Sequence, residues 1–527
     1  MRNSRLIVLL ALCLGCVTLS AQQGDKRENA LRKLIQSTVM INAMYVDTVN
    51  LDRQVEDAIT GMLSKLDPHS TYTNAEDTKK MNEPLQGNFD GIGVQFNMLD
   101  DTLVVIQPVA NGPSEKVGII AGDRIVSVND TAIAGVKMSR EKIMSRLRGP
   151  RGIVARLGII RRGIADVLTF TVTRDRIPVN SVDAAFMVRP GIGLIRFSNF
   201  AATTHDEVVE AINRLKQEGM KSLIIDLQGN GGGYLGAAAE IVSEFIEKGK
   251  MIVYTRGRGG ADMGEYRSTG SGLFTSGKLV ILVDEHSASA SEILSGAIQD
   301  HDRGTIIGRR TFGKGLVQRP IPLEDGSMIR ITVARYYTPS GRCIQKPYER
   351  GDAKSYAHDV IDRYNRGELT NADSIHFPDS LRYKTLKEHR TVYGGGGIMP
   401  DIFVPLDTTR YTRFYRELSA RSYINSASLQ YMDSHRAELK AKYTNFSDFN
   451  EGFTVPQELI EKVLADAANK DKLKPRDDEE LQQTQVNMRQ ILKGLIARDL
   501  WDLSEYFQVI YEDDPVVLKA VEVLQNK

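Results

Sequence analysis

The chain has few cysteines and only one long apolar run, and both shortages limit what it can be. Three cysteines occur in 527 residues, and two of them, Cys13 and Cys16, lie in the apolar run at the N-terminus. Only Cys343 remains in the rest of the chain, so no intrachain disulfide is expected. We interpret Cys343 as a tolerated small residue rather than a catalytic thiol. No later segment has about 18 uninterrupted apolar residues, so no internal membrane span is expected.

An excess of charge is also missing, which argues against nucleic acid as a partner. The formal net charge is +1 and there is no long basic run. With 41% hydrophobic and 26% charged residues, the composition is ordinary for a globular protein. The length predicts about three or four domains. The chain also lacks the G-x-S-x-G elbow that a Ser-His-Asp hydrolase would carry.

The N-terminus has the pattern of a secretory signal. Arg2 and Arg5 precede an apolar run over residues 6–14, and small residues follow up to Ala21. Cleavage after Ala21 is expected, and the protein is then exported, most plausibly to the periplasm, an oxidising compartment. A membrane-anchored lipoprotein attached through Cys16 is the alternative.

The stretch over residues 283–318 carries the clearest chemistry. Ser289 stands at the start of an apolar helical pattern, and Lys314 follows 25 residues later in a turn bracketed by glycines. Burial lowers the pKa of a lysine, so a desolvated Lys314 is neutral and takes a proton from a serine hydroxyl. A Ser-Lys dyad of this kind needs no histidine, metal or cofactor. The stretch therefore predicts a peptidase.

Ser289 also has a purely structural interpretation. Ser289-x-x-Glu292 fits a helix capping box, so the serine could serve only as an N-cap. The two roles are compatible, because the first turn of a helix has unpaired N–H groups and a positive dipole end. The Ala290 N–H would then be one donor to an oxyanion.

A glycine loop follows a buried strand elsewhere in the chain. The apolar run over 223–227 leads into DLQGNGGG at 226–233, followed by a helical pattern. A tight turn and a nucleotide-phosphate loop are the alternatives, but neither GxxxxGK(S/T) nor GxGxxG is completed.

The segment around the loop alternates strands and helices, which predicts an α/β core. Strands are expected over 192–197, 223–227 and 279–283. A capping box, Thr204-x-x-Glu207, is expected to open one helix, and a second helix lies around 238–245. A turn at 324–326 predicts a hairpin between 318–323 and 328–334, which would hold Gln318 close to Lys314.

Residues 87–176 resemble a PDZ domain. The similarity rests on GIGV at 91–94, NGPS at 111–114 and GDRIVSVN at 122–129. A PDZ groove accepts an extended peptide as an added strand and captures its terminal carboxylate with backbone N–H groups. The resemblance implies that Ile92, Gly93 and Val94 carry this binding.

SASASE at 287–292, followed by TFGKG at 311–315 and VQ at 317–318, resembles the C-terminal processing peptidases, or tail-specific proteases. The resemblance implies that Ser289 is the nucleophile, Lys314 the general base and Gln318 the residue that orients the lysine. It implies no metal or cofactor. Unstructured C-termini of proteins or peptides would be the substrates.

The family's D-x-R-x-N-x-G-G loop resembles residues 226–233 and implies that Gly231 or Gly232 gives the second oxyanion N–H. This chain has Gln228 where the family usually has arginine. LDPHS at 66–70 and Asp300 also match the family. We interpret His69 as part of a structural turn and Asp300 as a salt-bridge or helix-end residue.

Two rival functions follow from the same residues. In a Ser-His-Asp hydrolase His286 would be the base, but three residues before Ser289 it would point elsewhere. In a non-catalytic protein PDZ capture would be the whole function, yet Ser289, Lys314 and Gln318 are all present. We therefore favour an exported serine endopeptidase.

The expected architecture is a multidomain α/β protein with N-terminal helices and a helical C-terminal extension. Leu31, Leu34, Ile35 and Val39 recur at helical spacing, as do Val55, Ile59, Met62 and Leu66. The extension is a possible surface for a homo-oligomer or an adaptor. The predicted segments are a signal over 1–21, a helical region over 22–86, a PDZ domain over 87–176, a Ser/Lys protease core over 177–406 and the extension over 407–527.

Overall fold

The computed structural model describes residues 26–270 and 272–526, which form two compact units. The first unit comprises the chain up to residue 78 together with residues 318–332 and 348–356. The second comprises residues 79–317, 333–347 and 357–527. The predicted signal, with Cys13, Cys16 and Ala21, lies outside the described residues. Within the described ranges, no helix is long and apolar enough to cross a bilayer.

The first unit contains the two predicted N-terminal helices. One runs over 26–44, and α2 runs Leu51–Leu63 with Asn50 as its N-cap, whose Oδ1 accepts the Arg53 N–H at 3.0 Å. Both helices are confirmed, but the second ends earlier than the apolar spacing suggested. Leu66 lies in a turn, because its N–H bonds to the Leu63 carbonyl three residues back.

The LDPHS segment forms a turn organised by Asp67. Asp67 Oδ1 accepts the N–H groups of His69 and Ser70 at 2.9 and 3.0 Å, and Oδ2 accepts the Ser70 hydroxyl at 2.6 Å. The Thr332 hydroxyl donates to Asp67 Oδ1 at 2.9 Å. The structural role predicted for this turn is confirmed.

The predicted hairpin is also confirmed. Its strands are β17 (Leu316–Pro322) and β18 (Met328–Tyr337), and the turn is closed by the Leu323 N–H on the Ser327 carbonyl at 2.8 Å. Strand β1 (Thr71–Thr73) pairs antiparallel with residues 328–330 of β18.

The N-terminal part of the second unit, which includes the residues that resemble a PDZ domain, folds around a sheet of its own. A sheet of order β3-β4-β5-β7-β8 carries β6 on β5, and β2 pairs with β9. Its own apolar core includes Leu103, Ile125 and Ile159, all fully buried. The elements are α3 (Ala75–Gln86), β2 (Asn88–Gly91), β3 (Val94–Leu99), β4 (Thr102–Pro108), α4 (Pro113–Lys116), β5 (Arg124–Val128), β6 (Thr131–Ala132), α5 (Arg140–Leu147), β7 (Val154–Ile160), β8 (Leu168–Thr173) and β9 (Asp175–Pro178).

A six-stranded sheet of order β10-β11-β12-β15-β16-β21 forms the centre of the second unit. Every neighbouring pair is parallel except β10 with β11. The three predicted strands are confirmed as β11, β12 and β15. The strands are β10 (Val182–Arg189), β11 (Ile192–Phe197), β12 (Ser222–Asp226), β15 (Leu279–Val283), β16 (Thr305–Gly308) and β21 (Ile402–Phe403).

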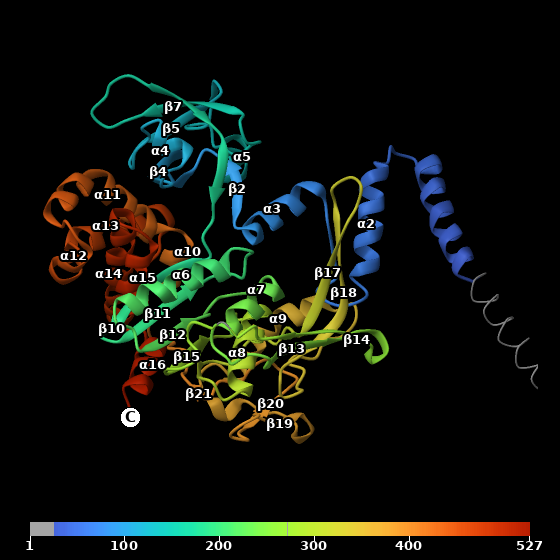
Figure 1. The fold of residues 1–527 in the computed structure, drawn as a ribbon. Helices are drawn as coiled ribbons and strands as arrows, with labels where there is room; N and C mark the ends of the chain where they lie inside the picture. Colours follow the sequence, from blue (N-terminus) through green and yellow to red (C-terminus); the bar gives the residue numbers. More distant parts are fainter. Residues whose placement is uncertain (1–25, 271, 527) are drawn as a thin grey trace, which may run out of the picture. The chain divides into compact units, whose positions relative to one another are not determined.

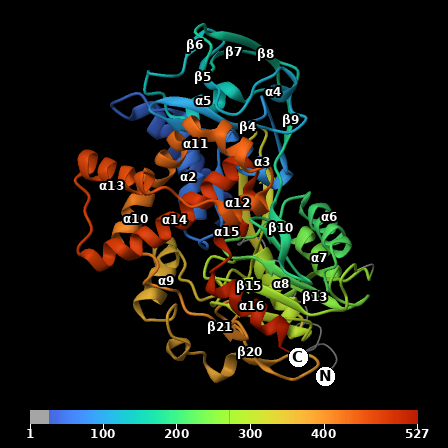
Figure 2. The ribbon, with the colours of Figure 1, turned by 90° about the vertical axis from the view of Figure 1, so that its left-hand side faces the viewer.

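Both faces of this sheet are covered, which explains the uninterrupted apolar runs. One face packs with the helices α6 (Thr204–Gln217), α7 (Leu235–Ser243) and α8 (Ala290–Asp300). The opposite face, which includes Leu194, Ile224 and Leu282, packs with α16 (Pro515–Gln525). In Figure 2, α16 lies beside β15. The last helix of the predicted extension is therefore a layer of the α/β core.

The capping box predicted at Thr204 is wrong. Helix α6 has Thr203 as its N-cap without a side-chain cap bond, and Thr204 is already the first helical residue. Glu207 instead accepts the backbone N–H groups of Ser181 and Val182 at 2.6 and 2.9 Å. Its carboxylate joins the helix to the start of β10, a contact that local sequence spacing does not reveal.

The remaining core elements include a second antiparallel group and a segment of short elements over 353–393. Strand β13 pairs with β14 and with residues 335–337 of β18, and β19 pairs with β20. These elements are β13 (Met251–Arg256), η1 (Arg258–Gly260), β14 (Asp262–Arg267), α9 (Ala353–Asn365), η2 (Ala372–Ser374), η3 (Asp379–Leu381), β19 (Arg382–Lys384) and β20 (Thr391–Tyr393).

The rest of the C-terminal region is helical with a separate apolar core, as expected (Figure 1). Met488 and Leu492, for example, are fully buried in this core. The helices are α10 (Arg413–Ala420), α11 (Tyr423–Lys442), α12 (Phe446–Gly452), α13 (Gln457–Asp471), α14 (Asp478–Leu500) and α15 (Leu503–Ile510).

Candidate active site

Ser289 lies between a buried strand and a helix, in a strained backbone conformation. It follows β15 and is the N-cap of α8, with φ of 57° and ψ of −111°. A residue other than glycine in such a region costs about 1–3 kcal/mol and persists only where its surroundings impose it. The side chain is half-buried. Ser289 is therefore held in place by tertiary contacts rather than by local preference.

Asp284 makes the first of these contacts, at the turn after β15. Its Oδ1 accepts the N–H groups of His286 and Ser287, each at 3.0 Å, and that of Gly229 at 3.0 Å. The Ser287 hydroxyl donates to the Leu227 carbonyl at 2.8 Å. One buried carboxylate thus joins the serine turn to the glycine loop.

Glu292 makes the second and most extensive contact. Its Oε2 accepts the N–H groups of Ser289 and Lys314 at 2.9 and 2.8 Å. Its Oε1 accepts the Thr311 hydroxyl at 2.6 Å and the Gly313 N–H at 2.7 Å. Burial raises the pKa of Glu292, while these bonds act in the opposite direction. A single carboxylate with no exposed surface holds the serine turn and the lysine turn together.

Tyr336 is a second side chain shared by the two turns. Its phenol oxygen lies 3.1 Å from the Ser289 carbonyl oxygen and 2.6 Å from the Lys314 carbonyl oxygen. Tyr336 is 1% exposed, so packing around its ring holds the hydroxyl in position. Neither Glu292 nor Tyr336 was assigned this role from sequence; the capping-box spacing pointed only to the Ser289 half of the Glu292 contacts.

The lysine turn is packed so tightly that its glycines are required. Gly313 has φ of 90°, and a Cβ there would lie 3.0 Å from Lys346 Cβ and 3.2 Å from Gly397 N. The Gly315 N–H donates to Gln345 Oε1 at 2.8 Å. The Lys314 side chain is half-buried. The turn therefore presents Lys314 from a rigid backbone.

Lys346 is a second lysine at this turn that sequence reasoning missed. Its N–H donates to the Gly313 carbonyl at 2.9 Å, and its ammonium pairs with Asp359 at 2.9 Å and lies 3.9 Å from the centre of the Phe312 ring. Burial lowers the pKa of Lys346, and Asp359 opposes that effect. These contacts explain Lys346 as a structural residue that stabilises the turn.

The glycine loop approaches Ser289 at Gly232. With φ of 103°, a Cβ on Gly232 would lie 2.8 Å from Ser289 Cβ and 3.0 Å from the Ala290 N. The Gly232 N–H donates to Asn230 Oδ1 at 2.9 Å. Gly231 is exposed, whereas Gly232 is buried. Only a glycine fits this position beside the serine.

Position 228 lacks the family's arginine, but a guanidinium still lies at the start of this loop. Arg196, on the neighbouring strand β11, donates from Nη2 to the Gln228 carbonyl at 2.9 Å and from Nη1 to Asp226 Oδ2 at 2.6 Å. The Gln228 N–H donates to Asp226 Oδ1 at 2.8 Å. Sequence gave no signal for Arg196, because it precedes the loop by about thirty residues.

Asp183 lies beside the same guanidinium and predicts a pH dependence of stability. Burial raises its pKa to about 6, although Arg196 acts in the opposite direction at 3.6 Å. A carboxyl whose pKa is raised on folding contributes stability below the unfolded pKa, and that contribution is lost as pH rises through the folded value. We expect the free energy of unfolding to fall by roughly 2–3 kcal/mol between pH 4 and 7, relative to an Asp183→Asn variant.

The measurement is chemical denaturation of both proteins at several pH values. Parallel curves for wild type and Asp183→Asn would contradict the expected titration. Asp226 and Glu207 also face this carboxyl and raise its pKa further, so the variant removes only one of three acids from the cluster.

Gln318 and His286 were considered as a lysine-orienting residue and as a rival base. In the first unit, Gln318 donates from Nε2 to Thr332 Oγ1 at 3.2 Å, and its orienting role toward the lysine stays a prediction. The His286 side chain is 62% exposed, with Nε2 3.8 Å from Glu285. This exposed position agrees with the prediction that His286 is not the base.

The predicted structural role of Asp300 is confirmed. It is the last residue of α8, and its Oδ1 pairs with Arg342 Nη2 at 2.7 Å, both side chains having no exposed surface. The Ser340 N–H donates to Asp300 Oδ2 at 2.9 Å.

Next to Arg342, burial raises the pKa of the Cys343 thiol and so disfavours the thiolate that a nucleophile needs.

The three predicted peptide-binding residues line a groove in the PDZ part of the chain. A cavity of about 290 Å³ lies between β3 and α5, lined by Ile92, Gly93 and Val94 and by residues of the facing helix such as Met144. The Gly93 carbonyl accepts the Val109 N–H at 3.0 Å, which fixes the loop. Strand β3 lies at the edge of its sheet, where an extended peptide can add as a further strand.

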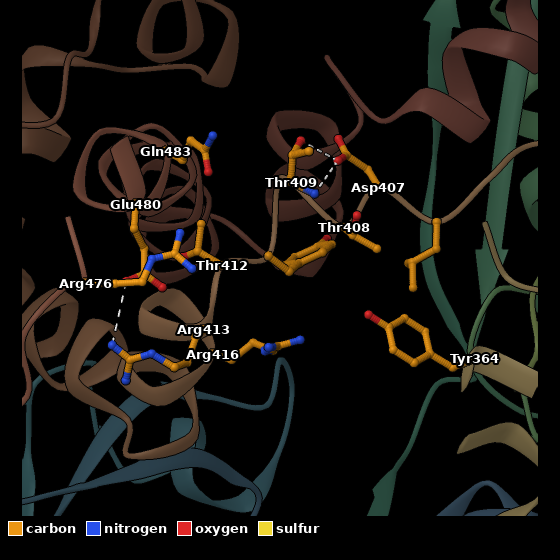
Figure 3. Close-up of a pocket in the computed structure, with 12 residues that line it drawn as sticks. Tyr364, Asp407, Thr408, Thr409, Thr412, Arg413, Arg416, Arg476, Glu480 and Gln483 are labelled. Atoms are coloured by element: carbon orange, nitrogen blue, oxygen red, sulfur yellow. Dashed lines mark hydrogen bonds and ion pairs between the residues drawn. The ribbon is translucent and has the colours of Figure 1, made fainter. Parts of the chain in front are cut away.

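A second cavity, of about 340 Å³, lies at the start of the helical C-terminal region and holds none of the candidate catalytic residues (Figure 3). Its wall is strongly charged, and the Arg413 guanidinium lies 3.6 Å from Glu480 Oε2. The cationic residues that line it are Arg413, Arg416 and Arg476. Its charges partly neutralise one another, so the cavity alone specifies no ligand.

Four family models match the chain. Peptidase family S41 matches residues 191–353 and the PDZ domain matches residues 91–172. The N-terminal domain of the activating protease CtpB matches residues 16–77, and a family of unknown function matches residues 414–502. The peptidase match includes Ser289, Lys314, Glu292 and the glycine loop.

Individual relatives agree with these matches. A carboxy-terminal-processing protease of Bartonella bacilliformis is 37% identical over 58% of this chain and 70% of its own length. The carboxy-terminal processing protease CtpB of Bacillus subtilis is 33% identical over 67% of this chain and 73% of its own. Among solved structures, a photosystem II D1 C-terminal processing protease is 25% identical over 71% of this chain and 93% of that one, with a TM-score of 0.35, too low for any argument from its arrangement.

The multidomain α/β architecture with a PDZ domain, and the class of enzyme, therefore agree with what the motifs predicted. The PDZ and peptidase family models match successive parts of the chain, residues 91–172 and 191–353. The chain belongs to the carboxy-terminal processing proteases of peptidase family S41, which are serine-type peptidases.

Proposed function

We propose that this protease cleaves peptide bonds with Ser289 as nucleophile and Lys314 as general base, through an acyl-enzyme. The observation that carries the proposal is the Glu292 carboxylate, which accepts the N–H groups of Ser289 and Lys314 at 2.9 and 2.8 Å. A nucleophile and its base must keep a fixed geometry, and a shared buried acceptor keeps their two backbones in register.

The proposed reaction has two halves. Neutral Lys314 takes the proton of the Ser289 hydroxyl as Oγ attacks the substrate carbonyl carbon. The tetrahedral intermediate collapses, the C–N bond breaks, and Lys314 returns the proton to the leaving amine. Water, deprotonated by the same lysine, then attacks the acyl ester, the C–O bond to Ser289 breaks, and Lys314 returns the proton to Ser289 Oγ.

Backbone N–H groups are the proposed stabilisers of the oxyanion. The Ala290 N–H is at the first position of α8, where helix N–H groups have no intrahelical partner. Gly232 lies against Ser289 and is the preferred second donor, with Gly231 as the alternative. In the structure the Gly232 N–H is bonded to Asn230 Oδ1, so an oxyanion would share that donor.

The substrates we propose are protein or peptide C-termini that are not folded. The PDZ groove supports this, because Ile92, Gly93 and Val94 line a cavity beside β3 into which an extended tail fits. An unfolded chain is also needed for a scissile bond to reach Ser289, whose side chain is only half-exposed. Gln318 is proposed to orient Lys314, on the family resemblance.

Export is proposed from the N-terminal residues alone. Arg2, Arg5 and the apolar run over 6–14 support a signal that is cleaved after Ala21. The proposed location is the periplasm, and a lipoprotein anchored at Cys16 is the alternative. Mass spectrometry of the mature N-terminus separates the two, because only the lipoprotein would begin with a lipidated Cys16.

Carboxylate capture is tested with an unfolded reporter whose C-terminus is either free or amidated. We expect amidation to raise KM by about tenfold and to leave kcat nearly unchanged, because the groove binds the terminus away from the reacting bond. Steady-state cleavage of both reporters is the measurement. Equal KM values would remove the tail-specific part of the proposal, and no cleavage by the wild type would overturn the peptidase activity.

A further inference from the structure

The glycine loop beside Ser289 is tied to a residue near the C-terminus. Arg196 Nη2 holds the Gln228 carbonyl at 2.9 Å, and its Nη1 lies 3.0 Å from the hydroxyl oxygen of Tyr511. The same Tyr511 hydroxyl donates to Asp226, the last residue of β12. Tyr511 lies between α15 and α16, 285 residues beyond Asp226.

The contact is buried and has several parts. Tyr511 is 4% exposed and Asp226 is fully buried. The ring of Phe507, on α15, lies 4.6 Å from the centre of the Arg196 guanidinium. The guanidinium therefore has the core on one side and the C-terminal region on the other.

Other bonds that hold the loop come from the core itself, among them the Phe200 N–H on the Gly232 carbonyl at 3.0 Å. The Gly229 N–H donates to Asp284 at 3.0 Å, and Asn230 Nδ2 donates to the Phe197 carbonyl at 2.8 Å. Among the described residues beyond position 502, Tyr511 contacts the loop directly at Asp226 and indirectly through Arg196, and Phe507 contacts Arg196. Gly232 follows Gln228 by four residues and lies so close to Ser289 that a Cβ on it would touch the serine.

We infer that Tyr511 and Arg196 are positioning residues for the reaction: the C-terminal region holds the glycine loop at the spacing from Ser289 that the oxyanion requires. The inference rests on the proposed function of Ser289 and of the glycine N–H. Neither side chain touches the substrate. Tyr511 fixes Arg196, Arg196 fixes the Gln228 carbonyl, and the loop then presents Gly232 to the serine.

A purely structural role is the competing account, because α16 also covers one face of the sheet. The two accounts differ in what they do to transition-state binding. A loop that shifts by a fraction of an ångström weakens the oxyanion contact, which forms only as the reaction proceeds, and so lowers kcat without raising KM. Loss of stability alone lowers the amount of folded enzyme but leaves both constants of the folded enzyme unchanged.

The test uses Tyr511→Phe, which removes one hydroxyl and keeps the ring. The matched control is Tyr443→Phe: Tyr443 is also buried in the C-terminal region, and its hydroxyl donates to the Gly452 carbonyl at 3.2 Å, far along the chain from the loop. Arg196→Lys is the second variant, because lysine keeps the charge but lacks the planar fork with which Arg196 bonds to Gln228 from one nitrogen and to Asp226 and Tyr511 from another.

We expect Tyr511→Phe to lower kcat by about tenfold with KM within about twofold, since complete loss of an oxyanion donor costs roughly 100-fold or more. Binding of a peptide boronic acid, whose tetrahedral adduct places an oxygen in the oxyanion position, should weaken by the same factor. Arg196→Lys should show the same pattern. Tyr443→Phe should lower the Tm by about as much as Tyr511→Phe does, but it should leave kcat unchanged.

Hydrogen exchange gives a readout that does not depend on activity. Peptides covering residues 226–234 should exchange faster in Tyr511→Phe than in wild type or Tyr443→Phe. Unchanged kcat and unchanged loop exchange in Tyr511→Phe, with only the Tm lowered, would overturn the inference. If the wild type cleaves nothing, or Ser289→Ala still cleaves, the proposed function fails, and the exchange data alone then decide whether Tyr511 holds the loop.

Discussion

Replacing Ser289 with alanine, or Lys314 with methionine, should each lower kcat/KM by about four orders of magnitude or more. The serine supplies the bond-forming oxygen, and without the lysine its hydroxyl is a poor nucleophile near neutral pH. Methionine keeps most of the length of the lysine side chain and removes only its basic end. Steady-state cleavage of an unfolded reporter by both variants is the measurement.

The double variant sharpens this prediction. Nucleophile and base act as a unit, so Ser289→Ala with Lys314→Met should be no slower than either single change. Additive losses would mean that the two residues contribute independently and would contradict the dyad.

Lys346→Met is the control, because Lys346 is a second lysine at the turn and is more deeply buried than Lys314. Its ammonium is already paired with Asp359 at 2.9 Å, so we expect activity to fall by less than about tenfold. Loss of cleavage in Lys346→Met with cleavage retained in Lys314→Met would transfer the role of base to Lys346.

Glu292→Gln should cost about two orders of magnitude in kcat although it leaves Ser289 and Lys314 in place. The carboxylate accepts four hydrogen bonds, two on each oxygen. A glutamine has one acceptor oxygen, and its amide N–H₂ would face two donors. Each buried donor left without an acceptor costs about 1–3 kcal/mol, so the serine and lysine turns should separate until those donors find water.

Glu480→Gln is the matched control for this change. Glu480 is also buried, near the start of α14, and accepts the N–H groups of Phe414 and Arg476 at 3.1 and 2.6 Å. Both variants should lower the Tm, but only Glu292→Gln should lower kcat. Equal kcat values in wild type and Glu292→Gln would show that the shared carboxylate stabilises the fold without holding the catalytic geometry.

The strands of the core were predictable because burial on both faces leaves a continuous apolar run. Residues 192–197, 223–227 and 279–283 coincide with β11, β12 and β15 to within a residue. The start of α6 was not predictable from the sequence, because the Thr204 and Glu207 side chains bond to residues outside their helix. A capping box requires only local spacing, whereas the actual partners of Glu207 are at positions 181 and 182.

Within the candidate site, the sequence by itself determined the residue types proposed to react and their local setting. Ser289 at a helix start and Lys314 between two glycines are both visible in a short stretch, because the backbone demands of each turn are local. Only the tertiary structure decided which groups hold these turns in register. Glu292 reaches Lys314 across 22 residues, Tyr336 joins both carbonyls, and Tyr511 meets Asp226 across 285 residues. The reason is that a buried hydrogen bond depends on which surfaces pack together, and that is set by the whole fold rather than by neighbours in the chain.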